Sequence, residues 1–188
     1  MALVDDLRRL ASVGTADYSL DGTNYWTDAQ LQERLDERRA LTVEQDLLWI
    51  QQTGAGTAYY QMASVSTPGD IEAGTAGGTI IDSEGGTITG WTADRDGLIS
   101  FAADTGGSAY SFTGYSYDLY AAAADVLENY AAAVADQFNF STDDQSFDRS
   151  QKHEQLLRSA ERYRARSSFG LGGDTQMIRS DVVPSAER

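Results

Sequence analysis

The chain has 188 residues, of which 41% are hydrophobic and 23% are charged, and it contains no cysteine and one histidine. This length suits one domain, or one domain with a sizeable insertion, and the hydrophobic fraction excludes a chain that is disordered by composition. A formal net charge of −15 argues against binding nucleic acid through its phosphates, since that requires clusters of Lys and Arg.

The basic residues are concentrated near the end of the chain. Residues 1–148 hold 24 acidic and 6 basic residues, whereas residues 149–188 hold 5 acidic and 8 basic residues. A basic tail on an acidic body suggests docking against an acidic surface, and a solvated helix with arginines on its outer face explains the same charges. The acid excess favours adaptation to high salt, because the alternative, a GC-rich genome, explains only the preference for Arg over Lys.

The first part of the chain is predicted to be helical. Leucines at helical spacing predict an amphipathic helix over residues 2–13, and residues 15–26 are expected to form a loop. Thr27 is expected to cap a second helix that runs to about residue 40. Residues 42–52 contain a second capping pattern that weakly favours a helix, with entry into a strand as the alternative.

Residues 54–114 differ in character, because they hold 13 of the 18 glycines and 7 acidic residues against one base, Arg95. Short runs rich in Thr, Ile, Tyr and Phe lie between glycine turns, which is typical of hairpins. These runs are residues 57–65, 79–82, 87–91, 98–101 and 109–112. We therefore predict a β meander inserted into a helical protein.

After Gly114 the helical pattern returns. An apolar stripe predicts a helix over residues 119–138, and its eight alanines between residues 121 and 135 allow another helix to approach closely. Residues 138–147 are expected to form a linker with aromatic anchors, followed by a last helix over residues 148–166. The side chains expected to face inward on that helix are Leu156, Leu157, Ala160 and Tyr163.

These elements predict an α+β fold, a bundle of about four helices with an inserted antiparallel β meander. Residues 1–53 and 115–166 would form the helical core, residues 54–114 the β-rich insertion, and residues 167–188 an extended tail. The start of the chain lacks a basic segment followed by a long apolar run, and no stretch approaches the ~18 apolar residues that a membrane span needs. We therefore expect a soluble protein made in a cytoplasm.

Groups that could carry catalysis are few. We interpret the one histidine, His153, as a helix-surface or inter-helix hydrogen-bonding residue rather than the base of a serine nucleophile. Asp94 and Asp96 begin a pattern that resembles a calcium loop. Leu98 and Thr105, however, stand where an EF-hand has acidic residues. We predict no catalytic residue, no cofactor and no metal site.

A series of short motifs runs through the last third of the chain. They are Tyr117-Asp118-Leu119-Tyr120, Ala121–Ala124, Asp125-Val126-Leu127-Glu128, Phe138–Phe147, Arg149-Ser150-Gln151-Lys152-His153 and Ala160-Glu161-Arg162-Tyr163-Arg164. In this order they resemble the head–tail connector, or adaptor, proteins of tailed bacterial and archaeal viruses. The segment Phe101–Gly107 also fits an insertion seen in some of them. With the N-terminal helices, the resemblance covers about two thirds of the chain.

The resemblance implies a non-enzymatic subunit of the virion neck, assembled in the host cytoplasm. Copies would form a ring, commonly of twelve, beneath the portal protein and above tail or tail-completion proteins. Genomic DNA would pass through the channel without sequence-specific binding, and the acidic composition adds a haloarchaeal host to this expectation.

The resemblance also implies that the C-terminal segment reaches the portal. The residues expected to dock there are Phe169, Leu171, Met177, Ile178, Arg179, Val182 and Val183. The basic residues that we expect at contacts between subunits are Arg149, Lys152, Arg158 and Arg162. The alternative is a module of the virion surface that uses exposed aromatic residues of the β insertion to bind carbohydrate or a host surface. A hydrolase that depends on His153 is the weakest hypothesis.

Overall fold

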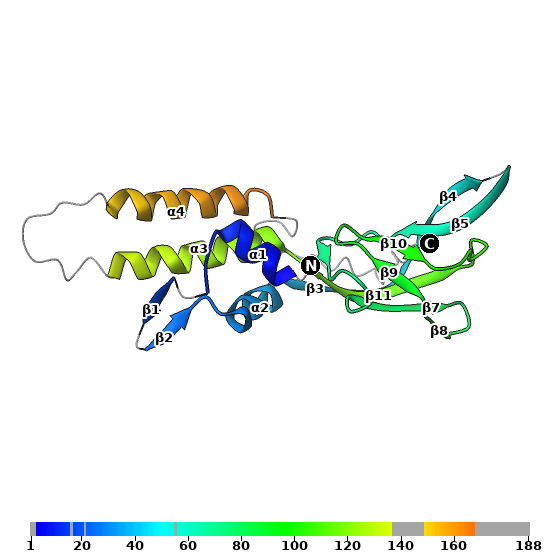
Figure 1. The fold of residues 1–188 in the computed structure, drawn as a ribbon, viewed down its shortest axis with the longest axis horizontal. Coiled ribbons are helices and arrows are strands. Elements are labelled where there is room, and N and C mark those ends of the chain that lie inside the picture. The colour runs from blue at the N-terminus through cyan, green and yellow to red at the C-terminus, as the bar shows by residue number, and fades with distance from the viewer. Residues whose placement is uncertain (1–2, 16, 21, 55, 137–148, 168–188) are drawn as a thin grey trace, which may run out of the picture.

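The computed structural model describes residues 3–15, 17–20, 22–54, 56–136 and 149–167. Within these ranges the chain forms four helices and eleven strands in three antiparallel sheets. Helices gather at one end of an elongated body and the two larger sheets at the other (Figure 1). The prediction of a helical bundle with an inserted meander is therefore wrong, because the fold is mixed and rich in strands.

The N-terminal part combines two helices with a small hairpin. The helices are α1 (Leu3–Ala11) and α2 (Asp28–Glu37). Thr27 caps α2 as predicted, because its hydroxyl accepts the Gln30 N–H while the Gln30 side chain accepts the Thr27 N–H. Strands β1 (Tyr18–Leu20) and β2 (Thr23–Tyr25) replace the loop expected over residues 15–26.

Stacked tyrosines explain why a hairpin forms there. The Tyr18 and Tyr25 rings are register partners and stack with their centroids 4.9 Å apart. On its other side Tyr18 stacks on Tyr130 of α3, 5.2 Å away. Aromatic pairs of this kind stabilise a two-stranded ribbon that would be marginal alone.

The two C-terminal helices, α3 (Leu119–Asp136) and α4 (Arg149–Arg164), lie side by side (Figure 1). The expected alanine stripe is confirmed, since Ala122, Ala123, Ala124 and Ala131 of α3 are fully buried. Small side chains let α1, α2 and α4 all pack against α3. On α4 the expected inward position of Leu157 is wrong, because this side chain is 36% exposed.

The β half contains nine strands. They are β3 (Arg39–Asp46), β4 (Leu48–Gly54), β5 (Thr57–Ser64), β6 (Asp70–Ile71), β7 (Gly78–Asp82), β8 (Thr87–Ile88), β9 (Trp91–Ala93), β10 (Leu98–Phe101) and β11 (Tyr110–Tyr117). One sheet has the order β4-β5-β10-β9. The other has the order β3-β11-β7-β8, with β6 also paired to β11. All five predicted β runs contribute to these strands.

Both sheets bury their inner side chains in one core. Its members include Ala63 and Ile99 of the first sheet and Ile80 and Phe112 of the second. A separate core fills the helical half around Leu7, Trp26, Leu31 and Leu35 of the N-terminal part and the inner side of α3. The chain passes between the halves at residues 38–39 and 117–118.

Residues 42–52 form strand, not the helix that their capping pattern weakly favoured. They supply most of β3 and β4, with Leu47 buried between the two. Pairing of β3 with β11 and of β4 with β5 satisfies their backbone groups and overrides the local signal.

Two expectations fall outside the described residues: the aromatic linker over residues 138–147 and nearly all of the tail over residues 167–188. Among the helices that the structure describes, none is both long and apolar enough to cross a membrane.

Candidate assembly surfaces

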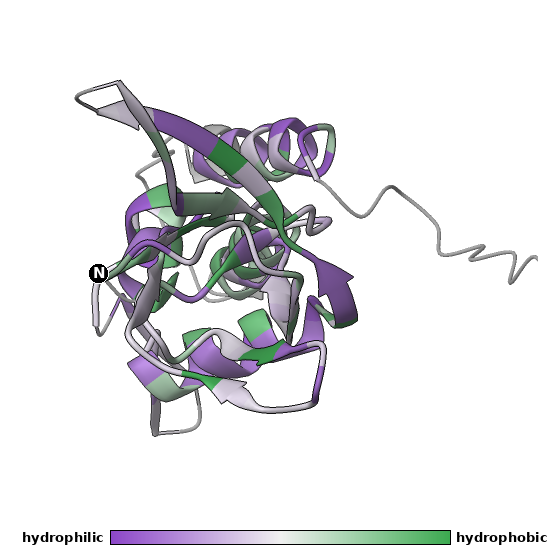
Figure 2. Cartoon of the chain, turned by 90° about the vertical axis from the view of Figure 1, so that its right-hand side faces the viewer, coloured by the Kyte–Doolittle hydropathy of each residue, from purple (hydrophilic) through white to green (hydrophobic). Residues whose placement is uncertain are grey.

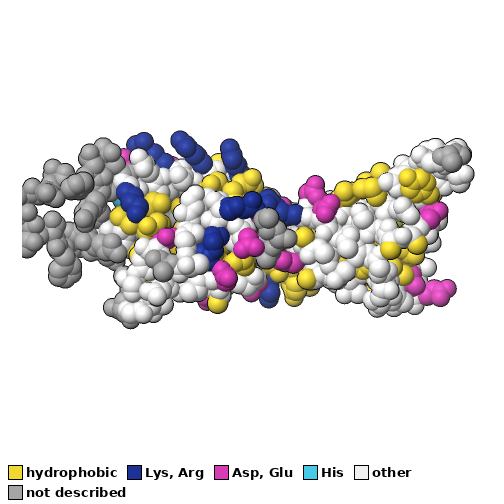
Figure 3. Space-filling model, viewed as in Figure 1, with side chains coloured by type: hydrophobic (Ala, Val, Ile, Leu, Met, Phe, Trp, Pro, Cys, Tyr) yellow, Lys and Arg dark blue, Asp and Glu magenta, His cyan; other side chains and the backbone are white. Residues whose placement is uncertain are grey.

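The outer face of α4 is basic. Figure 3 shows Lys and Arg side chains gathered over this helix. Lys152, Arg158 and Arg162, three of the predicted inter-subunit residues, are all exposed on it. The side chain of the fourth, Arg149, lies outside the described part, as do all seven predicted portal-docking residues of the tail.

Two of these basic residues also bond within their own chain. The Lys152 ammonium donates to the Tyr130 hydroxyl at 2.9 Å and lies 4.7 Å from the centre of that ring. Arg158 donates to Glu154 one turn earlier, at 3.2 Å, in a pair exposed to solvent on both sides. Such an exposed pair contributes little to stability, so Arg158 can turn to an external acidic partner.

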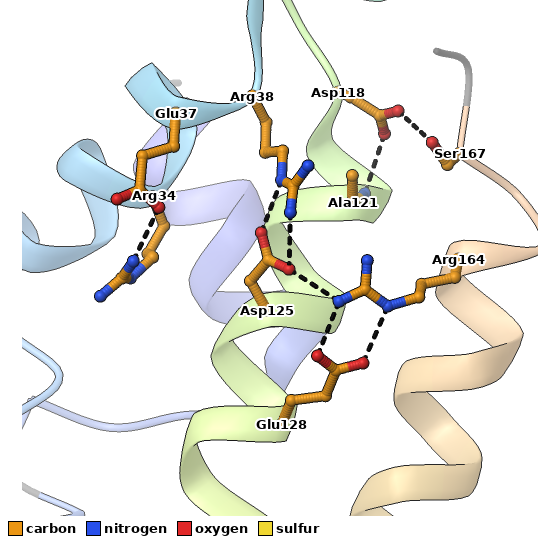
Figure 4. A network of polar contacts seen from close by, with 9 residues as sticks. All are labelled: Arg34, Glu37, Arg38, Asp118, Ala121, Asp125, Glu128, Arg164 and Ser167. Atoms are coloured by element: carbon orange, nitrogen blue, oxygen red, sulfur yellow. Dashed lines mark hydrogen bonds and ion pairs between the residues drawn. The ribbon is translucent and has the colours of Figure 1, made fainter. Parts of the chain in front are cut away.

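Arg164, near the end of α4, points inward instead (Figure 4). Its Nε lies 2.8 Å from Glu128 Oε1, and its Nη2 lies 2.6 Å from Glu128 Oε2 and 2.9 Å from Asp125 Oδ1. The hydrogen bonds to Glu128 are the main reason that the pKa of Arg164 is raised. This pairing fastens α4 to α3.

Arg38, at the end of α2, completes the network from the other side. Its Nε and Nη2 donate to the two oxygens of Asp125 at 2.6 and 3.1 Å, which raises the pKa of Arg38 (Figure 4). Asp125 thus accepts from Arg38 and Arg164 together, and its side chain is only 12% exposed. Three helices are joined at one carboxylate.

Asp118 lies between β11 and α3 and forms hydrogen bonds to three other parts of the chain. Its buried carboxylate accepts the Ala121 N–H at 2.8 Å as a helix cap, and accepts the Ser167 hydroxyl just after α4 (Figure 4). Its own N–H donates to the Arg38 carbonyl at 2.8 Å. The two crossings between the halves are therefore hydrogen-bonded to each other.

Arg95 forms a second connection between the halves. From the turn between β9 and β10 it reaches Asp70 of β6 at 3.1 Å and Asp6 of α1 at 3.2 Å. Desolvation opposes its charged form, but the hydrogen bonds and charges of Asp70 and Asp6 outweigh it, so the pKa of Arg95 is raised. The single base of residues 54–114 thus holds the β half against α1.

An apolar surface lies on the β half. On β3, Leu41 is 56% and Val43 60% exposed; on β4, Leu48 is 61% and Ile50 40% exposed. Tyr115 of β11, also exposed, stands directly across from Leu41. We call these five residues the apolar edge, because β3 and β4 each end a sheet among the described strands.

The hairpin of β4 and β5 projects beyond the rest of the β half (Figures 1 and 2). Hydrophobic side chains follow it in the space-filling view (Figure 3). Residues 47–69, which include the whole hairpin, contain no Asp, Glu, Lys or Arg, although 23% of the chain is charged. This uncharged run is the sequence signal that could have located the part of the apolar edge on β4, namely Leu48 and Ile50.

The residues considered above for catalysis or metal binding, His153, Asp94 and Asp96, lie in helix-packing and turn positions. His153 Nδ1 lies 3.0 Å from the Ala131 carbonyl, which is the inter-helix hydrogen bond expected for it. Asp94 and Asp96 lie in the turn from β9 to β10, where the Asp94 carbonyl accepts the Gly97 N–H. Across the described ranges, no three His, Cys, Asp or Glu side chains are grouped so that they could hold a metal ion.

Two open depressions flank Tyr163 between α1 and α4, with volumes of about 370 and 300 Å³. Both are lined in part by Leu10 and Ser12, and the Tyr163 hydroxyl donates to the Leu10 carbonyl at 2.8 Å. This bond ties the end of α1 to α4.

Comparison of the chain with protein-family models, with curated protein sequences and with solved structures gave no match.

Proposed function

We propose that this chain is a structural head–tail connector, or adaptor, subunit of a tailed virus. Copies form a ring beneath the portal, join the capsid to the tail and leave a channel through which DNA passes. The proposal rests on the order of motifs from Tyr117 to Arg164. The structural observation that supports it is that one subunit presents three chemically different surfaces: the basic face of α4, the acidic surface of the rest of the chain, and the apolar edge.

Unlike surfaces suit a ring. A head-to-tail contact joins two different patches, and repeated contacts of this kind close into a ring when the rotation between subunits allows it. The basic face of α4 and the acid excess of residues 1–148 are complementary in charge, so this face can meet a neighbouring copy or an acidic patch of the portal.

The ion pairs that join the helical half to the β half are consistent with a connector. A subunit that transmits force between capsid and tail must keep its two ends in a fixed relation. The Asp125 network and the bridge from Arg95 to Asp6 hold the helical and β halves together.

Charge also suits a DNA channel. With a formal net charge of −15, the subunits repel phosphates, which lets a genome slide past without adhering.

Binding of carbohydrate by the β half draws no support from its tryptophan and phenylalanine rings, although Tyr115 is 40% exposed. Trp91, Phe101 and Phe112 are buried, and Trp49 packs on Phe101 while its indole N–H donates to the Ser108 carbonyl at 2.8 Å. These rings build the core and present little face to a sugar.

The direct test is electron microscopy and sedimentation of the purified chain, with and without the portal protein of the proposed virus, at low and high KCl. We expect ring-shaped particles that cap the portal. Arg158→Glu combined with Arg162→Glu should weaken this binding, whereas Thr87→Glu, an exposed change on β8, should not. Failure of the wild-type chain to associate with the portal at any salt concentration would contradict the proposal.

A further inference from the structure

The free edges of the two large sheets are unequal. Among the described strands these sheets end at β8 and β9, of two and three residues, and at β3 and β4, of eight and seven residues. Exposed edges are usually kept short or charged, because a free edge pairs readily with another strand. Strands β8 and β9 are short and follow this rule, and β3 is long but carries Arg39, Glu44 and Asp46. Strand β4 is both long and uncharged.

Strand β4 lacks most of the usual protection, apart from an irregularity in its register with β5 between Ile50 and Gln52. It has no charged residue and no proline, and Leu48 and Ile50 expose most or much of their side chains. Among the described strands its backbone pairs only with β5, and the hairpin projects from the body (Figure 2). A projecting, uncharged strand with exposed apolar side chains is typical of a surface that binds another polypeptide.

Strand β3 offers a matching edge. Leu41 and Val43 point outward, beside Tyr115 on the neighbouring strand. A bulge follows, where Glu44 has a positive φ of 49° and its N–H bonds the Thr113 hydroxyl at 2.9 Å. The bulge leaves residues 39–42 as a short edge in regular register with β11, and the exposed Val43 stands at the start of the bulge.

Charge identifies the occupant as a second copy of this chain. Two copies, each with a formal net charge of −15, repel one another over most of their surface, and an uncharged strand is where they can approach. High salt, which an acidic chain suits, screens ion pairs but favours burial of apolar surface. Each copy also has one exposed edge of each kind, so neighbours can satisfy each other head to tail.

We infer that β4 of one copy adds to the free edge of β3 in the next, extending a sheet from subunit to subunit. This inference deepens the proposed ring and rests on it. It places the apolar edge, in addition to the basic face of α4, at the contact between copies.

The chain contains no cysteine, so engineered cysteines give a clean test. One preparation carries Leu41→Cys or Val43→Cys and the other carries Leu48→Cys or Ile50→Cys, which covers alternative registers. Facing residues on adjacent strands lie within reach of a disulfide. We expect disulfide-linked dimers when the two preparations are mixed and oxidised, in clear excess over either preparation alone.

Thr92→Cys, exposed on the short strand β9, is the matched control and should not link to Leu41→Cys. As a second measure, Ile50→Asp should weaken self-association about tenfold or more in sedimentation, with an unchanged circular dichroism spectrum. Equal linking of Leu41→Cys with itself would overturn the inference in favour of a two-fold contact. Rings in micrographs without any cross-link would preserve the proposed function and reject strand addition.

Discussion

Arg164 and Glu128 meet in a two-pronged ion pair between α4 and α3, with donor–acceptor distances of 2.8 and 2.6 Å. One of the same guanidinium nitrogens also reaches Asp125, which Arg38 binds from α2. Paired, parallel hydrogen bonds of this kind fix direction as well as charge. The orientation of the last helix, and of the basic face that it presents, therefore depends on one inward-pointing arginine.

Replacing Arg164 by Ala should lower the free energy of unfolding by about 2 kcal/mol, because it removes three charge-assisted bonds and leaves Asp125 with Arg38 alone. Arg164→Lys keeps the positive charge but lacks the planar guanidinium that donates two parallel hydrogen bonds. We therefore expect it to lose less free energy of unfolding than Arg164→Ala, but still to be less stable than wild type. Urea unfolding followed by circular dichroism measures both. Arg158→Ala, on the exposed side of the same helix, should change stability by no more than about 0.5 kcal/mol. Equal losses at the two positions would contradict the network's role.

Replacing Arg95 by Ala should loosen the β half from α1. Because the Arg95 side chain is 41% exposed, we expect a loss of only about 1 kcal/mol in the free energy of unfolding. Amide hydrogen exchange should quicken in the turn from β9 to β10 and at β6. Arg158→Ala is the control, since Arg158 pairs with Glu154 within α4 on a face exposed to solvent. Unchanged exchange in Arg95→Ala would show that packing alone joins the halves.

Local patterns predicted the elements that depend on local chemistry. Thr27 and Gln30 form the capping box within one turn, and the alanine stripe of α3 was visible as spacing. Glycine turns marked the hairpins. Each of these signals lies within the element that it specifies, so a single sequence contains enough information to find it.

The parts that were missed depend on distant partners. Strand β3 pairs with β11, whose register joins Leu41 to Tyr115, and no short window contains both. The hairpin of β1 and β2 needs Tyr130 of α3 to stack on Tyr18. Arg38 and Asp125 are separated by 87 positions. The apolar edge was missed for another reason: exposure is a property of the sheet order, and the uncharged run of residues 47–69 indicated it only indirectly.

Replacing Ala131 by Leu should destabilise the helical half, because Ala131 is fully buried on the side of α3 that faces other helices. Inserting larger groups into a packed core costs about 1–3 kcal/mol. Ala132→Leu makes the same change at the next position, which is exposed, and should alter the free energy of unfolding by no more than about 0.5 kcal/mol. Thermal unfolding of the two variants compares them directly. Similar midpoints would contradict the close helix packing.

Tyr18 should lose its hydroxyl proton at an unusually high pH. Burial, and then the neighbouring Tyr25 and Tyr130, raise its pKa from the ordinary 10.0 to about 12. The folded state thus holds this proton more tightly than the unfolded chain, so the associated stability is present below pH 10 and is lost as the pH rises from 10 to about 12. Because the pKa of Tyr117 is also raised by burial, the difference between wild type and Tyr18→Phe in an ultraviolet titration isolates the step. The control Tyr59→Phe should still show the deprotonation step that wild type has near pH 12. If Tyr18→Phe also shows that step unchanged, the step does not belong to Tyr18.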